Sequence, residues 1–261
     1  MRRLVRKGKD TMGNRIEGES APVGYAAIQN FFEERSSRAD VRSKYNYVLF
    51  QDDHPELAEK RDAMEKERIG AILAPHIHKG MCVLDLGCGI GRWGEYFLTK
   101  GIRYVGMDGS AGMVERGAEN LAGFTGKKLF QGYVQDFPRR LVEVGEKGAF
   151  DILLVNGVFM YLNDADFVKA LHDLRDYVAP SALIYLKESM GETERLTLQQ
   201  VESAELKQEY SAIYRSIAEY RKAFEETFSA PCYKRLSDGS LFASGRNRKE
   251  TLDYYFVYQR I

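Results

Sequence analysis

The chain has 261 residues, which suits one α/β domain with additions or at most two small domains. Lys and Arg together number 38, as do Asp and Glu, so no overall basic excess points to nucleic acid. The three cysteines lack metal-ligand spacing, and their odd number argues against a disulfide framework. No apolar run reaches the roughly 18 residues of a membrane span. We expect a cytoplasmic protein without nucleic-acid or membrane partners, either a monomer or a homodimer.

The N-terminal quarter divides into a tail and a helical segment. Residues 1–20 are polar and glycine-rich, which predicts a flexible tail. Tyr25, Ile28 and Phe31 then recur at helical spacing. Pro55 follows a turn and is suited to the first position of a charged, amphipathic helix that reaches about residue 74. We therefore place a helical segment at 21–74, ahead of a core domain at 75–261.

The core domain alternates apolar runs with helical patterns. Strands are predicted at 81–86, 104–107, 128–133, 150–155 and 183–187, with helices at 92–100, 111–123 and 165–178 between them. This order is typical of a parallel, doubly wound α/β sheet. A polar helical insertion is expected at about 191–230, mostly over 198–228. Two further strands, at 232–236 and 251–260, would form a C-terminal hairpin.

The most informative stretch is 83–92, which reads V-L-D-L-G-C-G-I-G-R. Glycine is needed where backbone takes a positive φ or approaches a ligand closely, and free N–H groups at a helix start favour an anionic group. The short G-x-G-x-G turn alone is shared with dinucleotide-binding proteins. The whole string resembles the first motif of class I S-adenosylmethionine (SAM) dependent methyltransferases. That resemblance implies a Rossmann-like, doubly wound seven-stranded sheet, with five parallel strands plus the hairpin, and SAM as cofactor.

The resemblance also assigns the cofactor-binding residues of the first two strands. The glycine turn would hold the methionine part of SAM, through Gly87, Gly89 and Gly91. Asp108, followed by Gly109, ends the second strand and would accept hydrogen bonds from the ribose hydroxyls, as acidic residues do in Rossmann nucleotide sites. The spacing fits NAD as well as SAM, and an ordinary turn aspartate is the simpler alternative.

The adenine ring would be held after the third strand. Gln135, Asp136 and Phe137 match a polar-Asp-apolar triplet, in which Asp136 accepts from the adenine amino group and Phe137 lines the ring pocket. A helix-capping role for Asp136 stays open. Met113 stands where an apolar residue often packs on the other face of adenine, although core packing suits it nearly as well.

Arg92 and Tyr161 bear on the subfamily. In the protein α-N-terminal methyltransferases, which the chain resembles weakly, the arginine matching Arg92 pairs with the SAM carboxylate, a good partner for a bidentate guanidinium. Tyr161 stands where that group often has histidine, which leaves deprotonation of the substrate open.

Three residues are candidates for the reaction pocket: Asn156, Tyr161 and Tyr47. Asn156 follows the fourth strand, where this fold faces the sulfonium, although it could simply cap the turn. Tyr47 belongs to an aromatic stretch that could act as a lid over SAM through cation–π contact, or could simply pack on the domain. Tyr210 or Tyr214 could roof the substrate. No acidic metal ligand stands near Asn156, so no metal is expected.

The resemblance implies a methyltransferase that acts on a small molecule by in-line transfer and releases S-adenosylhomocysteine. An alternative uses the same pocket to cyclise SAM itself, giving azetidine-2-carboxylate and methylthioadenosine. A third class, a non-catalytic SAM-binding protein, would show a degraded glycine turn or lack Asp108, and both are intact.

Overall fold

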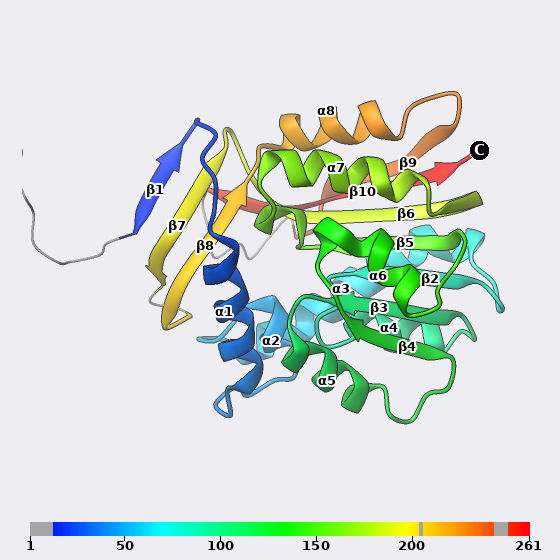
Figure 1. Ribbon diagram of the computed structural model, residues 1–261, viewed down its shortest axis with the longest axis horizontal. Coiled ribbons are helices and arrows are strands. Elements are labelled where there is room, and N and C mark those ends of the chain that lie inside the picture. The colour runs from blue at the N-terminus through cyan, green and yellow to red at the C-terminus, as the bar shows by residue number, and fades with distance from the viewer. Residues whose placement is uncertain (1–12, 204–205, 243–249) are drawn as a thin grey trace, which may run out of the picture.

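The computed structural model describes residues 13–203, 206–242 and 250–261, and its centre is a seven-stranded sheet in the order β4-β3-β2-β5-β6-β10-β9 (Figure 1). The first five strands of that order run parallel, and β10 pairs antiparallel with both β6 and β9. In chain order the sheet comprises β2 (Cys82–Leu86), β3 (Arg103–Asp108), β4 (Lys127–Gln131), β5 (Phe150–Asn156), β6 (Val178–Gly191), β9 (Tyr233–Ser240) and β10 (Thr251–Arg260). The predicted doubly wound sheet with a C-terminal hairpin is confirmed.

Helices cover both faces of this sheet, because alternate residues of each strand point to opposite sides. On β2, Leu84 and Leu86 join a core that includes residues of α7 and α8, whereas Val83 joins a core formed with α3 and α4. The helices of the core domain are α4 (Arg92–Leu98), α5 (Ala111–Asn120), α6 (Phe137–Glu143), α7 (Asp164–Arg175) and α8 (Ile217–Thr227). Short 3-10 turns are η1 (Ala74–His76), η2 (Val134–Asp136) and η3 (Phe159–Tyr161).

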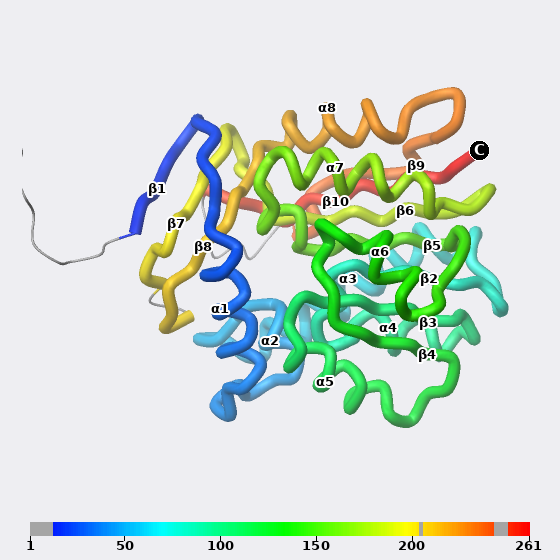
Figure 2. The backbone as a smooth tube through the Cα atoms, viewed as in Figure 1, coloured from blue at the N-terminus to red at the C-terminus, as the bar shows by residue number. Residues whose placement is uncertain are grey.

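A second, small sheet lies at one end of the molecule, in the order β1-β7-β8 (Figure 2). Its strands are β1 (Asn14–Glu17), β7 (Leu196–Ser203) and β8 (Gln208–Tyr214), all antiparallel to their neighbours. The predicted helix over 198–228 is therefore wrong in its first half, and only α8 is helical. Residues 14–17 of the expected flexible tail are likewise a paired strand, whereas residues 1–12 lie outside the described part of the chain.

The physical reason for the missed strands is a break in alternation. The β7–β8 register shifts between Leu198 and Val201, and Gln200 within this bulge has a φ of 51°. A bulge moves later side chains to the other face, so a two-residue period is not continuous along the segment. Lys207, at the turn into β8, also has a positive φ, of 54°.

The N-terminal segment is helical as expected, with α1 (Tyr25–Ser37), α2 (Asn46–Leu49) and α3 (Pro55–Leu73). Two charged residues of α1 attach it to its surroundings. The fully buried Arg35 donates to the carbonyl of Tyr47 and to Asp52, which ties α1 to the α2 segment. Glu33 accepts from the backbone N–H groups of Ala111 and Gly112, and so adds to the capping of α5, in which Ser110 accepts from the N–H of Met113. We call the segment 21–74 the N-terminal lid.

Candidate functional site

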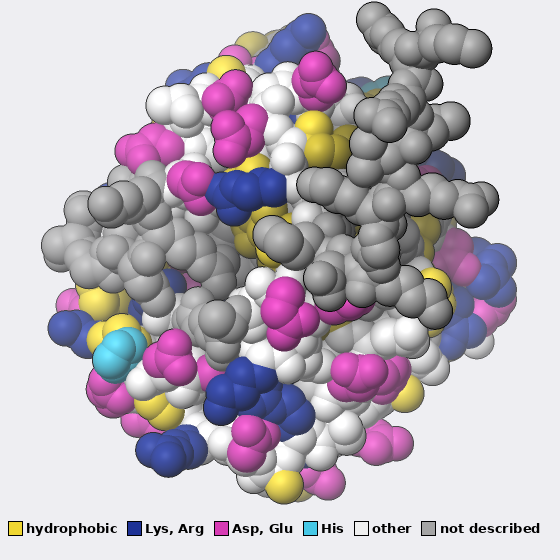
Figure 3. All heavy atoms as spheres, turned by 90° about the vertical axis from the view of Figure 1, so that its left-hand side faces the viewer, with side chains coloured by type: hydrophobic (Ala, Val, Ile, Leu, Met, Phe, Trp, Pro, Cys, Tyr) yellow, Lys and Arg dark blue, Asp and Glu magenta, His cyan; other side chains and the backbone are white. Residues whose placement is uncertain are grey.

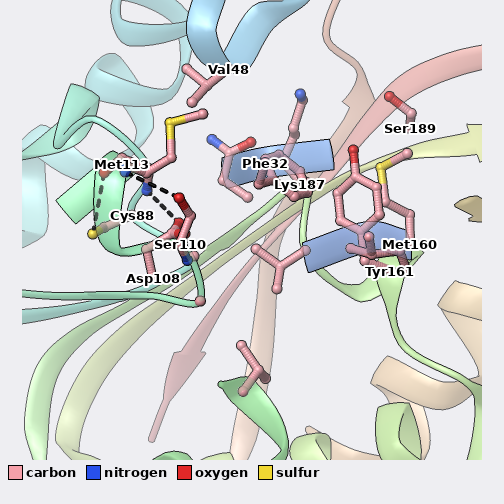
Figure 4. Close-up of a pocket in the computed structure, with 18 of the residues that line it drawn as sticks. Phe32, Val48, Cys88, Asp108, Ser110, Met113, Met160, Tyr161, Lys187 and Ser189 are labelled. Atoms are coloured by element: carbon pink, nitrogen blue, oxygen red, sulfur yellow. Dashed lines mark hydrogen bonds between the residues drawn. The ribbon is translucent and has the colours of Figure 1, made fainter. Parts of the chain in front are cut away.

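A cavity of about 710 Å³ opens at the carboxyl ends of the parallel strands, the edge where open α/β sheets bind ligands. Its walls come from the ends of β2, β3, β5, β6 and β10, and from residues of α1, α2, α3 and β8. Figure 4 shows Cys88, Asp108, Ser110 and Met113 on one side of it and Met160, Tyr161 and Ser189 on the other. The cavity thus spans most of the sheet edge.

The glycine turn after β2 requires its glycines. Gly87 has a φ of 75°, and a Cβ there would lie 2.2 Å from Cγ2 of Val158. Gly89 has a φ of 52°, and a Cβ there would lie 2.7 Å from Cγ1 of Val48. Both line the cavity. Gly91 is not among the lining residues: with a φ of 71° it lies at the N-cap of α4, beside Leu121, where it turns the chain into the helix.

Asp108 holds the glycine turn and the start of α5 together. Its Oδ2 accepts from the N–H of Gly89 at 2.8 Å, and its Oδ1 accepts from the N–H of Ser110 at 2.9 Å. Burial raises the pKa of this carboxyl, whereas the two N–H groups lower it. Each oxygen has a second lone pair, so Asp108 and neighbouring Gly109, which both line the cavity, can still accept from hydroxyl groups of a ligand.

The segment after β4 supplies the far end of the cavity. Gln135 and Asp136 line it, together with Met113 of α5. Oδ2 of Asp136 pairs with Arg139, while its buried Oδ1 has no hydrogen-bond partner and is left for a donor. Phe137 is placed differently from its prediction: it is fully buried and packs against Tyr177, because it begins α6 and faces the core. Tyr133 and Val134 line the cavity in its place.

Arg92 reaches the cavity but already has two carboxylate partners on α3. Its two terminal nitrogens donate to Asp62 Oδ1 and Glu65 Oε2, each at 2.8 Å. Glu65 was not predicted from the sequence. It accepts from several residues, because its Oε1 also receives hydrogen bonds from Trp93 and Tyr185. A signal was present: the buried residues of α3 recur at helical spacing, and both acids belong to that series, which is Ala58, Asp62, Glu65, Ile69 and Leu73.

Asn156, at the end of β5, is oriented by the same carboxylate, that of Glu65. Its Nδ2 donates to Glu65 Oε1 at 2.6 Å. A carboxylate can only accept, so the amide nitrogen must face Glu65 and the amide oxygen must face elsewhere. Asn156 lines the cavity, and no donor among the described residues reaches its Oδ1. The arrangement presents an acceptor oxygen to whatever occupies the cavity.

The aromatic candidates separate into two groups. Tyr161 lines the cavity, and its hydroxyl lies 2.8 Å from the hydroxyl of Tyr210, which also lines it. Tyr47 does not line the cavity: its hydroxyl donates to the carbonyl of Arg38 and its ring lies under the guanidinium of Arg116, so it attaches the lid to α5. Tyr214 is buried in a cluster with Phe31 and is likewise outside the cavity lining.

A polar cluster of four residues on the cavity wall is among the features that were not predicted from the sequence. Lys187 and Ser189 belong to β6, Asp253 to β10 and Arg61 to α3. Asp253 lies at their centre: its Oδ1 accepts from Ser189 at 2.8 Å and lies 3.2 Å from Lys187 Nζ, and its Oδ2 lies 3.9 Å from Arg61. Although burial opposes ionisation, Lys187 and the other donors lower the pKa of Asp253.

The described part of the chain also bears on metal, membrane and nucleic acid. It contains no group of three or more His, Cys, Asp or Glu placed to hold a metal ion. None of its helices is long and apolar enough to cross a membrane. On the face drawn in Figure 3, the described Lys and Arg side chains alternate with Asp and Glu and do not form a continuous basic patch.

Comparison with known proteins identifies the domain. Residues 84–184 match the family model of a methyltransferase domain. No relative was found among curated protein sequences.

Among solved structures, a SAM-dependent methyltransferase from Leishmania major superposes with a TM-score of 0.62 at 19% identity, over 87% of this chain and 81% of that one. Magnesium protoporphyrin IX methyltransferase from Synechocystis, with SAM bound, gives 0.62 at 14% identity, over 90% and 96%. Phosphoethanolamine N-methyltransferase 1 from Haemonchus contortus gives 0.64 at 15% identity, over 89% of this chain and 49% of that one. Residues 84–184 therefore match a methyltransferase domain, and the chain has the Rossmann-like fold of SAM-dependent methyltransferases, which confirms the resemblance seen in the glycine-rich motif.

Proposed function

We propose that the protein transfers the methyl group of SAM to a small molecule. The observation that supports this most directly is the order of polar groups along the cavity. Asp136, Asp108 and the Gly87–Gly89 turn follow the ends of β4, β3 and β2, which are neighbours in the sheet. Their free acceptors and tight backbone suit the adenine, ribose and methionine parts of SAM in that order. SAM so placed would direct its sulfonium toward Asn156 on β5.

The cavity continues past Asn156, and this supports a second substrate. Beyond the proposed donor half it is walled by Lys187, Ser189 and Asp253, and by aromatic residues that include Tyr161 and Tyr210. Cyclisation of SAM on itself needs no such space. In methyl transfer, a lone pair of the acceptor forms a bond to the methyl carbon as the carbon–sulfur bond breaks, and its electrons stay on sulfur. An acceptor N–H or O–H then gives its proton to water.

The residues would act mainly by alignment and by exclusion of water, since the sulfonium is already an activated leaving group. Asn156 is proposed to hold the acceptor through its free amide oxygen. Arg92, whose charge is balanced by Asp62 and Glu65, is proposed to fix α3 against the cavity and to assist the SAM carboxylate only secondarily.

The test is calorimetric titration of the protein with S-adenosylhomocysteine, beside Asp108→Asn and the exposed control Asp53→Asn. We expect binding by the wild type and by Asp53→Asn, with a Kd raised tenfold or more in Asp108→Asn, because a buried acceptor of ligand hydroxyls is lost, worth about 1.5–3 kcal/mol. Failure of the folded wild type to bind would refute the proposal. Incubation with SAM alone separates the alternative: catalytic formation of methylthioadenosine would show cyclisation.

A further inference from the structure

Lys187 is the most informative residue of the cavity that the donor half does not use. It ends the regular pairing of β5 with β6, as the partner of Asn156 in the parallel ladder. Its side chain is 9% exposed, and it lines the cavity. Figure 4 shows it rising above the strands, between the group around Asp108 and Ser189.

The ammonium of Lys187 has more N–H donors than Asp253 can accept from. Its one ion-pair partner in the described structure is Asp253, with 3.2 Å between Nζ and Oδ1. An ammonium carries three N–H donors, and one carboxylate oxygen accommodates one of them. A buried charge with unfilled donors is costly unless a ligand or water completes it.

The charges around Lys187 favour an acidic ligand group. Arg61 stands on the other side of Asp253, so two cations flank one carboxylate in this part of the wall. Two other acids act on the charge of Lys187, and both have partners of their own. Glu65 is paired with Arg92, and Glu188 accepts from three backbone N–H groups of the segment 158–160. Oδ1 of Asp253 also accepts from Ser189, its partner in the β6–β10 ladder, so Lys187 shares this oxygen with Ser189.

We propose that the methyl acceptor is a small acid, whose carboxylate or phosphate binds Lys187 while its amine or hydroxyl faces Oδ1 of Asn156. This inference rests on the proposed function and specifies its substrate class. Asn156 and Lys187 are partners in the parallel ladder, on strands about 4.8 Å apart, so one small molecule can contact both side chains. The aromatic wall suits the remainder of such a molecule.

The test uses matched pairs of aromatic acids and their amides, such as 3-aminobenzoate with 3-aminobenzamide and 3-hydroxyphenylacetate with 3-hydroxyphenylacetamide. Binding to the protein saturated with S-adenosylhomocysteine is measured by ligand-observed NMR. The wild type is expected to bind each acid about tenfold or more tightly than its amide, the range for one charge-assisted contact. Lys187→Met should abolish the preference, Lys187→Arg should keep most of it, and Lys60→Met, an exposed lysine of α3, should not change it.

Asp253→Asn supplies the opposite change. Removing the carboxylate that competes for Lys187 should tighten acid binding several-fold, which a purely structural role for the pair would not produce. Equal binding of acids and amides by the wild type, including no binding of either, would overturn the proposal, as would a preference that survives Lys187→Met. If S-adenosylhomocysteine itself does not bind, the proposed function fails, and the same pairs are then titrated against the free protein, where the Lys187 contact is judged alone.

Discussion

Glu65 gives the most specific stability prediction, because it is buried and all its hydrogen-bond partners are side chains of the structure. The side chain is 1% exposed and accepts from four residues, which are Arg92, Trp93, Asn156 and Tyr185. Glu65→Gln keeps the volume and one acceptor oxygen, but turns the other position into an amide donor that faces the guanidinium of Arg92. Losing one hydrogen bond to a buried charge costs about 2–3 kcal/mol. Glu65→Ala removes the shared acceptor of all four donors, of which Arg92 keeps Asp62 as a partner, and should cost about 4 kcal/mol.

The pKa of Glu65 points in the same direction. Burial opposes its ionisation, but the charges of Arg92 and Lys187 outweigh burial and lower the pKa from 4.5 to about 2. That depression corresponds to about 3 kcal/mol of stability. Because the folded pKa is the lower one, this stability is present above pH 4.5 and is lost as the pH falls toward 2. The difference between wild type and Glu65→Gln should therefore shrink over that interval.

The assay is urea unfolding at pH 7, followed by far-UV circular dichroism. Glu67→Gln, at an exposed position of the same helix, is the matched control and should lie within about 0.5 kcal/mol of the wild type. If Glu65→Gln were as stable as Glu67→Gln, the hydrogen bonds and ion pair of Glu65 would make no net contribution to the free energy of unfolding, and the reasoning would be refuted.

Three further predictions concern the glycine turn, the lid and the pH dependence. Gly87→Ala meets both the positive φ and Val158, so calorimetry should show loss of S-adenosylhomocysteine binding, whereas Gly145→Ala, at a positive φ in open space, should bind normally and lose only about 1 kcal/mol of stability. Gly112→Ala would bring a Cβ 2.1 Å from Oγ of Ser36 in α1 and should destabilise by about 1–3 kcal/mol in urea, whereas Gly123→Ala, with nothing within 4 Å, should not. Burial raises the pKa of Asp85 to about 7, so between pH 4 and 7 the unfolded chain releases a proton that the folded one keeps, and stability falls as the pH rises, by up to about 1.4 kcal/mol per unit. Asp85→Asn should reduce that slope in thermal melts, and equal slopes would contradict the assignment.

The donor half of the site was predictable because each of its parts is local. The apolar run of β2, the turn at Gly87 and the acid at Asp108 follow one another within single strand-to-helix connections, and parallel strands bring such connections to one edge. Phe137 was misplaced for a related reason. Its segment was recognised, but whether a residue at a helix start faces the cavity or the core depends on the angle of α6, which the triplet does not encode.

The acceptor half could not be predicted, because its polar groups come from distant parts of the chain. Asp253 reaches Lys187 only because β10 enters the sheet antiparallel to β6, in the register that places it opposite Ser189. A shift of one residue would turn its carboxylate to the other face. Glu65 similarly acquires its role from Arg92, 27 residues later. The motif therefore points to the proposed donor site, whereas the proposed acceptor site depends on strand register and on one buried helix face, neither of which leaves a contiguous pattern. For this reason Lys187 and Asp253, and not the glycine turn, are the residues whose substitution should alter which molecules are methylated.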